Sequence, residues 1–180
     1  TYSPMASLAT ARALMSVAVH YRLPIFHSDI PQAFIKAMLE NDVWLRLPPG
    51  VKPIDNNGKV HAIVKLVRSL YAGLRAAPQH FNKVLVSFMT KNRFEQSVAD
   101  TCRFSRQTDA GWVMVASEVD DLLITGTDSD AIAQFKQALI DEFAITDYAP
   151  ISSFLGVNIK YDVEEGEMLL DVEYKIDHLF

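Results

Sequence analysis

Apolar residues recur at helical spacing in three stretches of the chain. The first follows the pair Ser3-Pro4, a typical start, and predicts a helix over residues 4–21. The second begins at Pro78 and is the clearest, because its apolar residues form a continuous stripe. The third follows Gly126 and is capped by Asp128 or Ser129. The three apolar faces comprise Met5, Leu8, Met15 and Val19; Phe81, Val84, Leu85, Phe88 and Met89; and Ile132, Phe135, Leu139 and Phe143.

Runs typical of β-strands lie between and beyond these helices. Ile25 to Ile30 is a short run with Asp29 near its end. Two further runs, 43–47 and 60–66, are separated by a segment rich in turn residues and could pair. Other predicted strands cover 101–106, 112–116, 122–125, 154–161 and 168–172. This order predicts an α+β fold, an antiparallel sheet with a split β-α-β (ferredoxin-like) core backed by helices.

Three acidic residues interrupt the apolar run from Val113 to Gly126: Glu118, Asp120 and Asp121. Burying adjacent carboxylates without partners is costly, so such a run needs a turn or a bound cation at this point. A turn between two strands would hold the acids at the sheet edge. The neighbouring apolar residues Val113, Val115, Leu122 and Ile124 could then stay buried.

The composition indicates one compact domain over residues 1–180, because 49% of the chain is hydrophobic and 10% is aromatic. We find no membrane-length apolar run and no signal peptide, so an intracellular, non-secreted protein is expected. The lone Cys102 cannot form an internal disulfide, and the five histidines lack metal-ligand spacing. The chain begins at Thr1 and ends without a stop signal, so we interpret it as part of a longer protein.

The net charge of -5 conceals a separation of charge. Seven lysines and arginines, and no acid, lie between Lys59 and Arg93. Such a segment suits a bound polyanion. A solvated helix face explains it equally well.

Asp29 can lie beside the turn at 120–121 if the predicted sheet forms. Oxygen donors of this kind suit Mg²⁺, which also keeps sites for water and phosphate oxygens. Two such ions roughly 3.5–4 Å apart support phosphoryl or nucleotidyl transfer. An Asp-Asp pair alone is more often a solvated turn or a helix cap.

Several sequence blocks occur together in a known order: Asp29-Ile-Pro-Gln-Ala-Phe34, Val43-Trp-Leu-Arg-Leu-Pro-Pro-Gly50, Lys65-Leu-Val-Arg-Ser-Leu-Tyr71, Gly73-Leu-Arg-Ala-Ala-Pro78, Val119-Asp-Asp-Leu-Leu-Ile-Thr-Gly126 and Phe154-Leu-Gly-Val157. Over nearly its whole length the chain therefore resembles the reverse transcriptase of Ty1/copia-type retrotransposons, as a palm with part of the fingers. The resemblance implies RNA-directed DNA polymerase activity with Asp29, Asp120 and Asp121 holding two Mg²⁺ ions, with Mn²⁺ as a substitute.

The resemblance also implies partners: an RNA or DNA template with a DNA primer, deoxynucleoside triphosphates, and RNase H and integrase segments of the same polyprotein. It implies no membrane, and a cytoplasmic particle as the location. Phe34 would exclude a ribose 2′-hydroxyl, although core packing explains it too. Gly73, Arg75 and Pro78 would contact the incoming nucleotide, although a turn, a solvated charge and a helix start explain them equally. Phe154, Leu155 and Gly156 would grip the primer, although a strand with a bulge glycine accounts for them as well.

The chain departs from the family pattern in three places. Glu118 replaces the usual tyrosine before Val-Asp-Asp and is expected to raise the pKa of the neighbouring carboxyl groups and disturb the turn. Ala72 is an insertion, and Ala76 replaces a common glutamine. The alternative is therefore a decayed element copy that folds and binds nucleic acid without activity. A palm-type nucleotidyl cyclase would use similar aspartates but leaves the Pro-Pro-Gly and Phe-Leu-Gly blocks unexplained.

Overall fold

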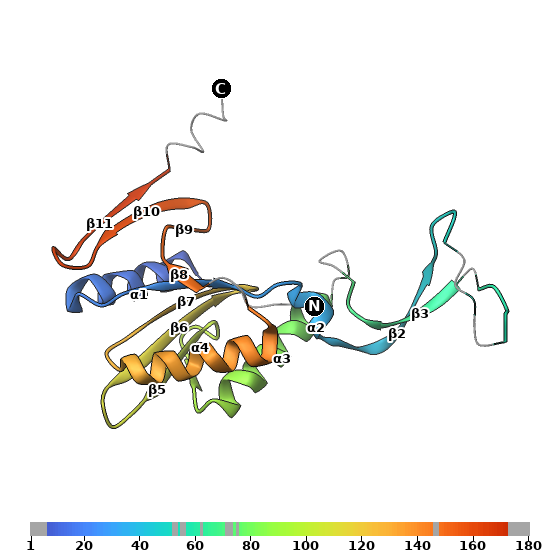
Figure 1. The fold of residues 1–180 in the computed structure, drawn as a ribbon, viewed down its shortest axis with the longest axis horizontal. Helices are drawn as coiled ribbons and strands as arrows, with labels where there is room; N and C mark the ends of the chain where they lie inside the picture. Colours follow the sequence, from blue (N-terminus) through green and yellow to red (C-terminus); the bar gives the residue numbers. More distant parts are fainter. Residues whose placement is uncertain are drawn as a thin grey trace. The chain divides into compact units, whose positions relative to one another are not determined.

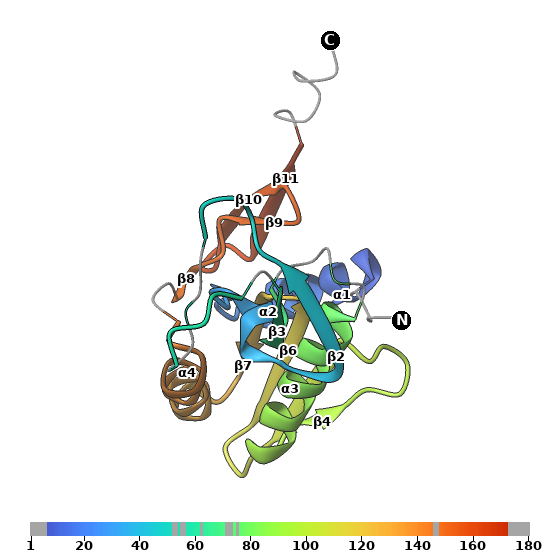
Figure 2. The ribbon, with the colours of Figure 1, turned by 90° about the vertical axis from the view of Figure 1, so that its right-hand side faces the viewer.

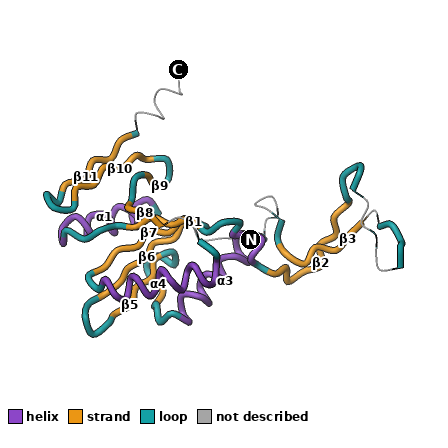
Figure 3. Tube along the Cα trace, in the orientation of Figure 1, coloured by secondary structure: helices purple, strands orange, loops and turns teal. Residues whose placement is uncertain are grey.

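A computed structural model describes residues 7–51, 54, 57–61, 63–70, 74, 76–145 and 148–172 (Figures 1 and 3). Helices are combined with runs of antiparallel strands, which is consistent with the α+β class that the sequence predicts. The helices are α1 (Leu8–Tyr21), α2 (Ala33–Lys36), α3 (Ala77–Lys91) and α4 (Ser129–Phe143). The strands are β1 (Phe26–Asp29), β2 (Met38–Arg46), β3 (Ile63–Arg68), β4 (Glu95–Gln96), β5 (Arg103–Gln107), β6 (Trp112–Glu118), β7 (Asp121–Gly126), β8 (Tyr148–Pro150), β9 (Ser153–Phe154), β10 (Val157–Asp162) and β11 (Glu167–Asp171).

The chain divides into two compact units. The hairpin unit contains Thr1–Ser3 and Gln32–Val84, and the sheet unit contains Pro4–Pro31 and Leu85–Phe180. The division falls within α3, after Val84. The single domain over residues 1–180 that composition indicates stays a prediction.

The sheet unit is built on a sheet with the strand order β4-β5-β6-β7-β1-β8. Every neighbouring pair in it is antiparallel, and β1 lies between β7 and β8 although β7 comes about ninety residues later. Figures 1 and 2 show α1 on one side of this sheet and α4 on the other. A second small sheet, in the order β11-β10-β9, completes the unit.

Two hydrophobic layers hold β7 in place. Leu123 packs in the cluster that joins α1 to β9 and β10, together with Leu14, Ala18 and Phe154. Since side chains alternate along a strand, Leu122 and Ile124 project to the opposite face, where α4 contacts β7. All three β7 side chains are fully buried, at 0% exposure. The strand leading from the acidic turn is therefore among the most buried parts of the chain.

The first helix begins later than the sequence predicts. It starts at Leu8, not residue 4, and Ser3 and Pro4 lie outside the described residues. The Ser7 hydroxyl caps it by accepting from the Thr10 backbone N–H at 3.0 Å. The Asp100 carboxylate, distant in sequence, accepts from the Ser7 backbone N–H at 3.3 Å. This tertiary contact fixes the start of the helix.

The other two predicted helices agree closely with the structure. The second begins at Ala77, one residue before Pro78, and buries Phe81, Leu85, Phe88 and Met89. The third is capped by Asp128, whose carboxylate accepts from the Ala131 backbone N–H at 2.9 Å. None of the helices in the described part of the chain is long and apolar enough to cross a membrane.

The hairpin unit pairs β2 with β3, as the alternating pattern predicts. Val43 lies opposite Leu66 and Leu45 opposite Val64, with an irregular register nearer Met38. Lys65 Nζ lies 2.6 Å from Asp42 Oδ1, and Lys83 forms an ion pair with Glu40. Both pairs are exposed, and the solvent screens their attraction, so they add little to stability. At least two cations of the basic segment thus have acidic partners on β2, and binding of a polyanion there stays a prediction.

Cys102 gives a simple test of the sheet unit's integrity. Burial raises the pKa of its thiol to about 12, and the negative charges of Asp100 and Glu118 act in the same direction. At pH 8 only about one thiol in 10⁴ is then ionised, and the thiolate is the reactive form. We expect negligible labelling by a disulfide reagent in the folded chain and full labelling in urea, where the pKa returns to its ordinary value. Rapid labelling of folded chain at pH 8 would contradict this burial.

Candidate active site

The predicted acidic turn forms between β6 and β7. Glu118 pairs with Asp121, which leaves Val119 and Asp120 as a two-residue turn. Val119 has a φ of 55°, a conformation that is strained for a β-branched side chain. The turn thus places Asp120 and Asp121 at the end of the hairpin while the apolar residues of both strands stay buried. The sequence prediction of this arrangement is confirmed.

Asp29 lies directly beside this turn. It is the last residue of β1 and pairs with Asp121 across the two strands. Directly opposed residues of an antiparallel pair project from the same face, with Cα atoms about 4.5–5.5 Å apart. The Ile30 backbone N–H donates to the Asp120 carbonyl oxygen at 2.9 Å, which fixes the turn to the chain following Asp29. The structure therefore brings Asp29 together with two acids that come about ninety residues later in the sequence.

Burial and neighbouring acids affect the ionisation of Asp29 and Asp120. Burial raises the pKa of Asp29, the charges of Asp120 and Asp121 raise it further, and His27 partly opposes this shift. Burial also raises the pKa of Asp120, and the charge of Asp121 adds to this effect, while a hydrogen bond from its own backbone N–H acts the other way. The ionised forms are thus disfavoured without a counterion. A bound cation would relieve this repulsion.

The donor chemistry of these residues fits a hard divalent cation, because Mg²⁺ prefers carboxylate oxygens. The described residues nevertheless contain no group of three or more His, Cys, Asp or Glu side chains arranged to hold a metal ion. Asp29, Asp120 and Asp121 are neighbours rather than a closed set of ligands. These three are the residues that would hold the ion.

Glu118 lies at the base of the turn without preventing it from forming. The turn closes through the pairing of Glu118 with Asp121, so the expected disturbance of the turn is not seen. The charge of Glu118 raises the pKa of the Cys102 thiol. The identified charges that raise the pKa of Asp29 are those of Asp120 and Asp121.

His27 is a polar neighbour that sequence reasoning missed. Its Nε2 atom lies 2.8 Å from Oδ1 of Asp121. The signal was present in the sequence, because His27 precedes Asp29 by two positions and so shares its face of β1. A lone histidine without metal-ligand spacing did not by itself indicate a functional role.

Two of the predicted nucleotide-binding residues, Phe34 and Pro78, belong to the hairpin unit. Phe34 lies in the short helix α2 and is half-buried, and Pro78 lies in the first turn of α3. Gly73 and Arg75 lie outside the described residues. Their predicted contacts with nucleotide therefore stay predictions.

The predicted primer-grip residues lie in the sheet unit. Leu155 and Gly156 form the turn between β9 and β10, with φ values of 50° and 71°. Both values are positive, as in the turns that favour tight hairpins. Phe154 is buried in the cluster beneath α1, and its ring meets the His27 ring at 6.0 Å in an edge-on arrangement. Core packing accounts for the position of the Phe154 ring. Any contact with primer would therefore have to be made by the exposed part of the turn.

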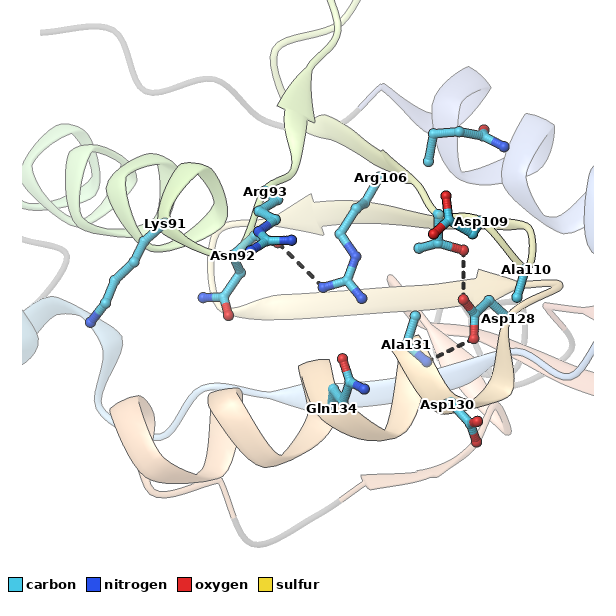
Figure 4. Close-up of a pocket in the computed structure, with 12 residues that line it drawn as sticks. Lys91, Asn92, Arg93, Arg106, Asp109, Ala110, Asp128, Asp130, Ala131 and Gln134 are labelled. Atoms are coloured by element: carbon cyan, nitrogen blue, oxygen red, sulfur yellow. Dashed lines mark hydrogen bonds between the residues drawn. The ribbon is translucent and has the colours of Figure 1, made fainter.

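A polar pocket of about 640 Å³ lies at the other end of β6, away from the acidic turn (Figure 4). Its polar groups have structural roles. Asp128 caps α4 and accepts from the Thr108 hydroxyl at 2.5 Å. The Arg106 guanidinium lies over the Phe94 ring at 5.6 Å from its centroid. None of the predicted site residues lines this pocket, so the acidic turn remains the candidate site.

Comparison with known proteins identifies sequence relatives over almost the whole chain. Residues 1–175 match the family described as reverse transcriptase (RNA-dependent DNA polymerase). The chain is 29% identical over 99% of its length to the retrovirus-related Pol polyprotein from transposon TNT 1-94 of Nicotiana tabacum. It is 32% identical, over 99% of its length, to the corresponding polyprotein from transposon RE1 of Arabidopsis thaliana. It is 25% identical, over 81% of its length, to the putative transposon Ty5-1 protein of Saccharomyces cerevisiae, of which it covers 46%.

The chain spans only 13% and 12% of the two plant polyproteins. These proteins therefore contain much more than the segment that the chain matches.

Proposed function

Because the chain belongs to the reverse transcriptase (RNA-dependent DNA polymerase) family, in its Ty1/copia-type branch, we propose that it is the palm, with part of the fingers, of an RNA-directed DNA polymerase. The observation that carries this proposal is the meeting of Asp29 with Asp120 and Asp121 at one end of the sheet. The protein that carries the chain would extend a DNA primer on an RNA or DNA template.

The strand order supports the palm assignment. Within the larger sheet, β8, β1, β7 and β6 are adjacent in that order. Along the chain, α3 lies between β1 and β6, and α4 lies between β7 and β8. Two β-α-β segments interleaved in one antiparallel sheet are what a split β-α-β (ferredoxin-like) core would require, so this order supports the proposal.

Three side chains would form the catalytic centre. Asp29, Asp120 and Asp121 would hold two Mg²⁺ ions through their carboxylate oxygens, and Mn²⁺ would suit the same donors. Such ions, when bound, increase the acidity of an attacking hydroxyl and offset charge on the leaving group. The chain's own contribution is positional, since β1 fixes Asp29 while the turn fixes the other two carboxylates.

The remaining roles rest on the family resemblance. Phe34 would exclude a ribose 2′-hydroxyl, and Gly73, Arg75 and Pro78 would contact the incoming deoxynucleoside triphosphate. The exposed part of the turn at Leu155 and Gly156, supported by Phe154, would contact the primer. RNase H and integrase segments would accompany the chain, because the relatives are Pol polyproteins.

The second candidate is a decayed copy that binds nucleic acid without catalysis. Glu118 and the Ala72 insertion favour it, because one departs from the family pattern beside Val-Asp-Asp and the other in the segment that the resemblance assigns to nucleotide contact. The regular turn beside Glu118 instead favours the first candidate, an active polymerase.

Primer extension separates the two candidates. The protein that carries this chain is mixed with an RNA template, a DNA primer, deoxynucleoside triphosphates and Mg²⁺. We expect extension to full template length, its loss on chelation with EDTA, and its return when Mg²⁺ is added in excess. Binding of primer and template without extension under any metal condition would favour the decayed copy.

A further inference from the structure

His27 connects the proposed catalytic carboxylates with the hairpin that carries the proposed primer grip. It lies on β1 two residues before Asp29. Its Nε2 atom is 2.8 Å from Asp121 Oδ1, and its ring forms a T-shaped pair with the Phe154 ring, with the centroids 6.0 Å apart. One side chain thus contacts residues from two elements that come more than ninety positions after it.

The hydrogen bond has one chemically reasonable direction. An ionised carboxylate only accepts, so the imidazole Nε2–H donates to Asp121. The two side chains are 28% and 35% exposed, which leaves the pair partly shielded from water. With Oδ1 held by His27, rotation of the Asp121 carboxylate is restricted while Oδ2 stays available to another partner.

We propose that His27 is a positioning residue that orients the Asp121 carboxylate for metal binding, an inference that rests on the proposed function. Partners that hydrogen-bond to ligating carboxylates orient them, and their loss typically lowers metal affinity about 10–100-fold. The Phe154 ring, packed against the imidazole, limits its tilt, so the hairpin beneath α1 helps to orient the carboxylate.

The competing explanation is that His27 only fills space between β1 and Phe154. Two substitutions distinguish these roles. His27→Leu keeps much of the side-chain volume but cannot donate a hydrogen bond. His27→Gln retains an amide N–H at about the position of Nε2 and can still donate to Asp121.

The test measures binding of Mn²⁺ by electron paramagnetic resonance, in the protein that carries this chain. The difference between wild type and Asp120→Asn isolates metal bound at this site. We expect His27→Leu to weaken that binding about tenfold or more, and His27→Gln to stay within about threefold of wild type. The Mg²⁺ concentration for half-maximal primer extension should rise more in His27→Leu than in His27→Gln. His20→Leu, at an exposed histidine of α1, is the matched control and should change neither quantity.

The outcomes separate this inference from the proposed function. Wild-type Mn²⁺ affinity in His27→Leu, or equal loss in His27→Leu and His27→Gln, would overturn the positioning role while leaving polymerase activity intact. Wild type that neither binds more Mn²⁺ than Asp120→Asn nor extends a primer would refute the proposed function, and the inference with it. Thermal unfolding of each variant checks that lost binding does not reflect lost folding.

Discussion

Asp120→Asn is expected to lower primer extension about 10³-fold or more while the fold stays intact. Asparagine keeps the shape of the side chain but removes its charge, and with it an oxygen donor suited to a divalent cation. The effect should appear mainly in kcat, because the carboxylate acts on the reacting groups. Single-nucleotide incorporation by the protein that carries this chain, at saturating primer, template and Mg²⁺, measures it.

The same substitution should not lower the stability of the metal-free protein. Burial raises the pKa of Asp120, as it does that of Asp29, so ionisation of either group disfavours the folded state. For a carboxyl with a raised pKa, stability is lost as the pH rises from the unfolded-state pKa through the folded-state pKa. At neutral pH Asp120→Asn removes one such charge, and its thermal midpoint should equal or exceed that of wild type.

Asp109→Asn supplies the matched control. Asp109 is an exposed acid in the hairpin between β5 and β6, at the other end of β6. Its substitution makes the same chemical change in a similar turn and should leave extension unchanged. If Asp120→Asn and Asp109→Asn had equal activity, the acidic turn would have no role in catalysis.

The sequence predicts local features of this chain well where one physical constraint dominates. Unpaired carboxylates are costly within a buried strand, so the acids at 118, 120 and 121 predicted either a turn or a bound cation, and a turn is found where β6 meets β7. The stripe from Phe81 to Met89 likewise has one low-energy solution, a helix with that face buried.

The features that sequence reasoning missed depend on contacts between distant residues. Ser7 becomes the cap of α1 partly because Asp100 reaches it, and no local pattern links the two. His27 acquires a partner only when β1 pairs with β7. The meeting of Asp29 with Asp121 was predictable only through a topology, the split β-α-β order, that itself came from the sequence of elements.

The charged turn depends on the rigidity of the strands that carry it. Carboxylates that repel one another favour spreading apart, and the buried side chains of β6 and β7 resist this movement. On one face these strands contact α4. The aromatic residues that anchor α4 should therefore matter more for stability than any residue of the site itself.

Phe135→Ala is expected to lower the free energy of unfolding by about 3–5 kcal/mol. The side chain is 1% exposed. Its ring lies 4.6 Å from that of Phe94 and 6.0 Å from that of Phe88, measured between centroids. Truncation removes its apolar contacts and leaves a cavity that rigid neighbouring rings cannot fill. Urea unfolding followed by far-ultraviolet circular dichroism measures the loss.

Gln134→Ala is the control, one residue away on the exposed side of α4. Like Phe135→Ala, it truncates a side chain of α4 to alanine. It should change the free energy of unfolding by no more than about 0.5 kcal/mol. Phe135→Leu should lose less than the alanine variant, because most of the cavity stays filled. Equal stability of Phe135→Ala and Gln134→Ala would mean that the aromatic cluster does not hold α4 to the sheet. The turn would then need another source of rigidity.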